Sequence, residues 1–111
     1  MERTINLPDY EVHEITTNDG VRVREFVDAA GVVFGIAWSA PYTPDLQQLL
    51  GVHFERFTRR VAEIPRGNVH RSLRTADAQL VVEMGGHMRA VVGRAYLPAS
   101  LPVGFSVAEL R

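Results

Sequence analysis

Cysteine and lysine are both absent from this sequence, and all twelve basic residues are arginine. Without cysteine the chain can form neither a disulfide nor a thiolate zinc site, and it cannot use a cysteine nucleophile. No apolar run approaches the about 20 residues of a membrane-spanning helix. The opening Met1-Glu2-Arg3-Thr4 lacks the apolar stretch of a signal peptide. We therefore expect a chain without a membrane span that folds around its own hydrophobic core.

The composition is that of an ordinary folded domain. The 111 residues are 46% hydrophobic and 23% charged, values typical of a single globular domain of common size. We expect one domain over residues 1–111, in which residues 1–9 form an extended or disordered N-terminal segment.

Charge is distributed unevenly along the chain, although the net charge is only −1. Residues 1–55 carry three arginines and nine acids, whereas residues 56–94 carry eight arginines and three acids. We expect the two halves to neutralise each other across neighbouring strands. The alternative is an exposed basic face that binds an anion or nucleic acid. Its arginines would be Arg56, Arg59, Arg60, Arg66, Arg71 and Arg74. This region lacks the aromatic platform on which single-strand binders stack bases, which argues against nucleic acid as the partner.

Three segments rich in β-branched and aromatic residues predict three strands joined by tight turns. They are residues 10–17, 21–28 and 32–39, separated by Asn18-Asp19-Gly20 and Ala29-Ala30-Gly31. A three-residue turn ending at Gly20 places Glu14 opposite Arg24, whereas a two-residue turn places Glu14 opposite Glu25. Because like charges directly opposite each other destabilise a strand pair, we predict the three-residue turn.

The third of these strands is apolar on both sides, which predicts a central position in the sheet. The same turn argument sets Phe26 beside Phe34 and Val27 beside Val33. Residues that alternate along a strand share a face. We therefore predict one core face made of Val32, Phe34, Ile36 and Trp38.

A helical pattern follows the three strands. Thr43 suits the N-cap, Pro44 the first helical position, and Asp45 the positive end of the helix dipole. Apolar residues then recur at helical spacing at Leu46, Leu49, Leu50, Phe54, Phe57, Val61 and Ile64. Gly51 allows a kink or break in this pattern. We predict an amphipathic helix that starts at residues 43–45 and buries Leu49, Leu50, Phe54, Phe57 and Val61.

Three further strands are predicted at residues 69–74, 79–84 and 88–97. The first is thinly apolar, which suits a sheet edge. Gly85-Gly86-His87 is interpreted as a three-residue turn that places Glu83 opposite Arg89; a two-residue turn would place Val82 opposite Arg89. The predicted fold class is α+β, an antiparallel sheet in the chain order βββ-α-βββ packed against one amphipathic helix.

The four histidines show no spacing that binds a metal. They are His13, His53, His70 and His87, and we predict neither a metal site nor a cofactor. In the predicted register His13 lies opposite Glu25, as a general base oriented by a carboxylate would. Such a pair is more often a charged contact between strands, and we predict no catalytic residue.

Four residues are the candidates for binding. His87 and Arg89 lie at the predicted end of the last hairpin. Trp38 and Tyr42 flank Pro41 at the junction between strand and helix, a place where ligand pockets occur. Each has a simpler structural interpretation as well, namely a turn residue, a core tryptophan or a loop tyrosine.

Two strings carry a resemblance to a known family. They are Trp38-x-x-Pro41-x-x-Pro44-Asp45-Leu46-x-x-Leu49-Leu50-Gly51 and Gly85-Gly86-His87-Met88-Arg89-Ala90-x-x-Gly93-Arg94-Ala95-x-Leu97-Pro98. Over about residues 10–111 the chain resembles a family of small proteobacterial proteins catalogued only as a domain of unknown function. The resemblance implies no catalytic residues. Because members of that family typically begin with a secretion signal, it implies export to the periplasm or beyond, with this chain as the mature part.

The functional hypothesis is a non-enzymatic exported domain that binds a protein or cell-envelope component through a sheet face or edge. Two alternatives remain. One is a small enzyme with its site around His13 and Glu25, and the other is an anion or nucleic-acid binder that uses the arginine-rich region.

Overall fold

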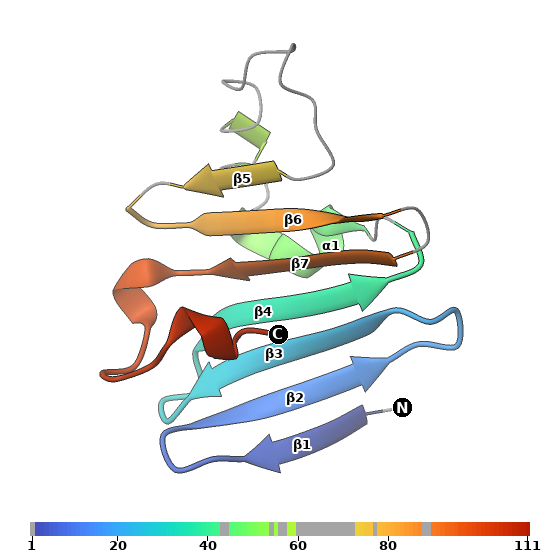
Figure 1. Cartoon of the computed structure of the whole chain (residues 1–111). Helices are drawn as coiled ribbons and strands as arrows, with labels where there is room; N and C mark the ends of the chain where they lie inside the picture. The colour runs from blue at the N-terminus through green and yellow to red at the C-terminus, as the bar shows by residue number, and fades with distance from the viewer. Residues whose placement is uncertain are drawn as a thin grey trace.

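One antiparallel sheet organises the chain. The structure is a computed structural model that describes residues 2–42, 45–53, 55, 58–59, 73–76, 78–87 and 90–111. Within these residues seven strands form a sheet in the order β1-β2-β3-β4-β7-β6-β5 (Figure 1). The strands are β1 (Glu2–Asn6), β2 (Tyr10–Thr16), β3 (Arg22–Asp28), β4 (Val33–Ala40), β5 (Leu73–Ala76), β6 (Val81–His87) and β7 (Ala90–Tyr96). Two meanders, β1–β4 and β5–β7, therefore meet where β4 pairs with β7.

The predicted order βββ-α-βββ is wrong because a fourth strand precedes the helix. Residues 2–6 form the edge strand β1, and every residue of it is exposed. Pairing with β2 holds this strand, and Arg3 contributes an ion pair with Glu14 at 3.1 Å. The sequence pattern missed the strand because hydrogen bonds and a charge pair, and not burial of apolar side chains, keep it in place.

The long amphipathic helix is not confirmed. The helix α1 covers only Leu46–Leu50, and a 3-10 turn, η1, covers Gly51–His53. Its N-cap is Asp45, whose side chain accepts a hydrogen bond from the main-chain N–H of Gln48 at 3.2 Å. Gly51 ends the helix with a φ of 56°, a left-handed conformation that glycine adopts without steric cost.

Burial along the helix agrees with the prediction only in part. Leu50 is buried and Leu49 half-buried. Phe54, Phe57 and Val61, also predicted to be buried, lie outside the described residues, as do Thr43 and Pro44.

The register of β2 and β3 is as predicted. Glu14 lies opposite Arg24, and Gly20 occupies the turn with a φ of 92°. Between β3 and β4, Val27 lies opposite Val33 as predicted, but a bulge then places Phe26 opposite Gly35. Because the bulge adds one residue to the strand, Phe34 faces away from Ile36 and Trp38, and the predicted single core face is wrong.

The register of β6 and β7 differs from the prediction. β6 continues through Gly85 and Gly86 to His87, which lies opposite Ala90, so Glu83 lies opposite Arg94 and not Arg89. Gly86 has a φ of 125°, and an added Cβ there would overlap the carbonyl oxygen of Ala90. Gly86 therefore permits close approach of the two strands, and both glycines lie within β6 and not in the turn.

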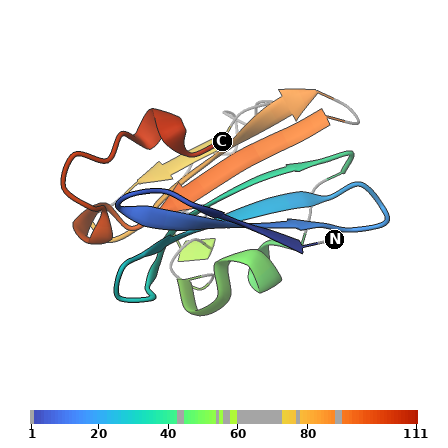
Figure 2. The same ribbon diagram turned by 90° about the horizontal axis from the view of Figure 1, so that it is seen from below.

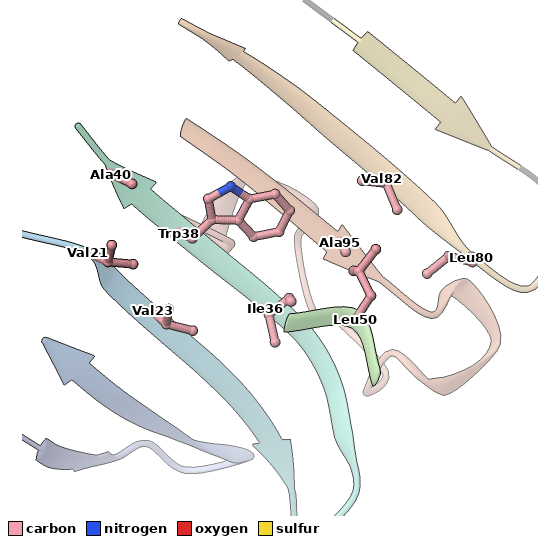
Figure 3. Close-up of a cluster of buried hydrophobic side chains, with 9 residues drawn as sticks. All are labelled: Val21, Val23, Ile36, Trp38, Ala40, Leu50, Leu80, Val82 and Ala95. Carbon is pink, nitrogen blue, oxygen red and sulfur yellow. The ribbon is translucent and has the colours of Figure 1, made fainter. Parts of the chain in front are cut away.

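The sheet carries a different cover on each face (Figure 2). On what we call the helix face, α1 lies over a cluster of Val21, Val23, Ile36, Trp38, Ala40, Leu50, Leu80, Val82 and Ala95 (Figure 3). On the opposite face, here the tail face, residues 97–111 form a tail with two short 3-10 turns, Pro98–Ser100 and Val107–Glu109.

Aromatic residues hold the tail on its face. The ring of Phe105 meets the rings of Phe34 and Tyr10 edge-on, with centroids 5.0 and 5.2 Å apart. Leu110 is buried against Val12, Phe26, Phe34 and Ala37. This packing covers only part of the tail face.

Trp38 and Gly93 fit together where the two meanders join. They lie directly opposite each other on β4 and β7, and a Cβ added to Gly93 would overlap the six-membered ring of Trp38. Trp38 is only 4% exposed. The absence of a side chain at position 93 is therefore what lets the indole lie flat over β7.

We predict that Gly93→Ala lowers the free energy of unfolding by about 1–3 kcal/mol, because the added methyl overpacks the core against Trp38. Urea denaturation followed by circular dichroism measures the change. In a Trp38→Leu background the same substitution should cost much less. An equal cost in both backgrounds would show that Trp38 does not determine the need for glycine.

Candidate functional site

A row of side chains crosses the tail face from one edge of the sheet to the other. Strand pairing sets Arg3, Glu14, Arg24, Ala37, Arg94, Glu83 and Arg74 opposite one another in that order. Directly opposed residues share a face of the sheet. We call this set the arginine row: two Arg-Glu-Arg triads flank the small residue Ala37.

Each glutamate of the row lies between two guanidinium groups. Glu14 accepts from Arg24 Nε at 2.7 Å and from Arg3 Nη2 at 3.1 Å. Glu83 lies 3.2 Å from Arg94 Nε and 3.6 Å from Arg74 Nε. Each triad therefore keeps one net positive charge.

The ion pairs of the two triads differ from the expectation that the two halves of the chain neutralise each other. Each triad draws its members from one half of the chain, so these four ion pairs neutralise charge within the halves and not between them.

Glu14 is the best-held carboxylate of the row. Its side chain is 12% exposed. The hydrogen bond from Arg24 is the main cause that lowers the pKa of Glu14 below its ordinary value, and the charge of Arg3 adds to the effect. The carboxylate therefore stays ionised and fixes the positions of both arginines.

Beside the row lies a groove of about 540 Å³, which we call the arginine groove. Its charged lining consists of Arg22, Arg24, Arg74, Arg94, Arg111 and Glu83, a net side-chain charge of +4. Small or apolar residues form its floor, namely Ala37, Ser39, Gly85 and Val92. Leu110 and Arg111 of the tail line it where they cover Ala37.

Two arginines of the groove already bind polypeptide. Arg24 Nη1 donates to the main-chain oxygen of Arg111 at 2.5 Å, and Arg94 Nη1 donates to that of Val107 at 3.0 Å. Arg22 is exposed at the end of β3, and it forms no ion pair among the described residues. The groove therefore has positive charge that ion pairs among the described residues do not neutralise.

His13 and Glu25 lie opposite each other as predicted, without forming an enclosed site. The His13 side chain is 42% exposed, and its Nε2 lies 3.2 Å from a carboxylate oxygen of Glu11 on the same strand. By strand alternation His13 faces the helix side of the sheet, whereas Ser39 lines the arginine groove on the other side. The serine hydroxyl that a catalytic arrangement would need is therefore on the wrong face.

The four predicted binding residues do not come together. Trp38 is a core residue, and its Nε1 has no hydrogen-bond partner in the described part of the chain. The backbone of His87 ends β6, and Arg89 lies outside the described residues. Tyr42 is exposed and donates its hydroxyl hydrogen to Asp19.

Tyr42 and Asp19 tie the β2–β3 turn to the end of β4. The hydroxyl of Thr17 also donates to Asp19. The hydrogen bonds from Thr17 and Tyr42 lower the pKa of Asp19, and the bond to Asp19 raises the pKa of Tyr42. These three residues border a hollow of about 820 Å³ between α1 and the helix face. These hydrogen bonds therefore have a structural role at the rim of that hollow.

Two further findings concern the part of the chain that the structure describes. In residues that it describes, no group of histidine, aspartate and glutamate is placed to hold a metal ion. None of the helices described there is long and apolar enough to cross a membrane.

Sequence reasoning missed the groove because its arginines are scattered along the chain. The sequence suggested a basic region of six arginines. Of these, Arg74 lines the groove, and Arg59 is exposed and pairs with Glu55 at 3.8 Å. The other four lie outside the described residues. A usable signal existed in Arg22 and Arg24, whose spacing of two along a strand places both on one face.

The chain belongs to a family described as a protein of unknown function (DUF2844), whose model matches residues 1–110. This confirms the resemblance seen in the sequence. Neither a curated protein nor a solved structure matches the chain.

We predict that Glu14→Gln lowers the free energy of unfolding by about 1 kcal/mol near neutral pH. The pKa of Glu14 is lower in the folded than in the unfolded chain, so its stabilisation is complete above an unfolded pKa of about 4.3 and is lost as the pH falls through the folded value. Urea denaturation between about pH 7 and about pH 3 should show the two proteins converging in acid. The control is Glu2→Gln, because Glu2 is exposed on β1 and forms no ion pair among the described residues. A difference that stays constant with pH contradicts the assignment.

Proposed function

We propose that this chain is a non-enzymatic binding domain that attaches to a protein or cell-envelope component through the arginine groove. One observation carries the proposal: an open groove on the sheet is lined by five arginines and one glutamate above a floor of small residues. Charge of one sign that is not balanced locally attracts a partner of the opposite sign and speeds its association.

The groove is also fixed in shape before any partner arrives. Glu14 and Glu83 orient Arg24 and Arg94 by ion pairs of 2.7 and 3.2 Å, and the tail accepts hydrogen bonds from the same two arginines. A preorganised surface loses less conformational entropy on binding than a mobile one. This supports recognition by the sheet face.

In this proposal the domain acts in the periplasm or outside the cell, as the family resemblance implies. The alternative of an enzyme built around His13 and Glu25 has less support, because His13 is solvated and contacts Glu11. A general base needs an orienting partner and a space for the reacting atom beside it.

We predict that Arg22→Glu strongly weakens binding of the partner to the domain. Immobilised wild type and variant are incubated with the native envelope fraction, and the retained components are compared by quantitative mass spectrometry. Arg22 forms no ion pair within the described residues, so the folded state should tolerate the change. Reversal of this one charge in the groove should reduce retention by about tenfold or more.

Arg59→Glu is the matched control, because it makes the same change of charge at an exposed arginine away from the groove. A component retained by wild type and by this control, but lost from Arg22→Glu, supports the proposal. Equal retention by all three proteins overturns it. Circular dichroism and thermal melting check that both variants remain folded.

A further inference from the structure

We infer that the ligand of the arginine groove is an extended polypeptide segment with carboxylate side chains at alternate positions. The inference rests on the proposed function and names the ligand class for the same groove. It draws on three features of the site: the spacing of the arginines, the direction in which they are held, and the chain that already lies there.

The spacing of the arginines matches an extended chain. Arg22 and Arg24 are two residues apart on β3 and share the tail face, which separates them by about 7 Å along the strand. Alternate side chains of an extended ligand have the same separation. A ligand lying along β4 can therefore place one carboxylate near each of these two guanidinium groups.

The arginines line two sides of the groove and do not converge on one point. Arg24 on β3 and Arg94 on β7 are separated by β4, which amounts to about 9–10 Å between their strands. Each is pulled away from the other by its own glutamate, Arg24 by Glu14 and Arg94 by Glu83. A single small anion needs donors that converge on it, whereas a chain of spaced charges fits two charged walls.

The tail shows how polypeptide binds to this face. Arg94 donates to the peptide carbonyl of Val107, so this guanidinium group already recognises a peptide backbone, and Arg24 donates to a main-chain oxygen of Arg111, the last residue of the structure. Beyond Leu110, which packs on Ala37, the floor continues along β4 to Ser39, whose small side chain leaves room for a second backbone. Val92, which is 52% exposed, gives an apolar contact beside it.

Single-stranded nucleic acid is a spaced polyanion too, and it is the competing ligand class. Its bases need exposed aromatic rings to stack on. In the described lining of the groove the one aromatic residue is Trp38, which is buried in the core. The groove therefore suits carboxylates on a peptide better than phosphates that carry bases.

The test uses fluorescence anisotropy with the full chain and a labelled peptide that has glutamate at every second position and threonine between. The matched probe replaces each glutamate with glutamine. The glutamate peptide should bind at least about tenfold more tightly than the glutamine peptide. Raising the salt concentration from about 50 to about 500 mM should weaken binding of the glutamate peptide, because screening reduces the attraction between the charges.

Protein variants locate the binding. Arg22→Gln should weaken the glutamate peptide about threefold to tenfold, while Arg59→Gln should leave it unchanged. A labelled oligothymidylate and inorganic phosphate serve as alternative ligands. Equal binding of the two peptides, no binding of either, tighter binding of the oligonucleotide, or indifference to Arg22→Gln each overturns the inference.

Failure of this inference is separable from failure of the proposed function. If neither peptide binds while the envelope component still depends on Arg22, the ligand class is wrong and the groove remains the binding surface. If retention of the envelope component does not depend on Arg22, the proposed function is wrong.

Discussion

The pairing of β4 with β7 is the contact on which the rest of the molecule depends. It joins a four-strand meander to a three-strand meander, and no turn connects the two strands directly (Figure 1). The indole of Trp38 lies over Gly93, where a side chain would have no room. The same pairing sets Ala37 opposite Arg94 and so brings two separate charged triads into one row. The core packing of one face thus determines the charge pattern of the other.

In the proposed function the helix face contributes mainly to stability and the tail face also contributes to recognition. Apolar residues under α1 fill the helix face, and the aromatic residues Phe34, Tyr10 and Phe105 fasten the tail on the opposite face. The tail covers the apolar part of its face and leaves the charged part open. Surface ion pairs alone contribute little to stability. The ion pairs of the arginine row therefore supply little folding energy, which agrees with the proposed role of the row in binding.

Several features of the fold could be predicted from local chemistry. The turn at Gly20 and the repulsion between Glu14 and Glu25 were enough to place Glu14 opposite Arg24, one half of the arginine row. The corresponding argument failed at Glu83, since Gly85 and Gly86 are typical turn residues but here lie within β6, where Gly86 permits close approach to β7. Glycine permits a tight turn and a close strand contact alike, and its neighbours in sequence do not distinguish between them.

By itself the sequence determined the strand-rich α+β character, the β2–β3 hairpin and the exclusion of cysteine chemistry, because each depends on residue type or on neighbours a few positions apart. Only the tertiary structure decided which strands meet at the centre of the sheet, and hence that Arg22, Arg24, Arg74, Arg94 and Arg111 line one groove. Pairing between distant strands depends on how side chains of different size fit across them. The fit of Trp38 to Gly93 appears only when both strands are in place.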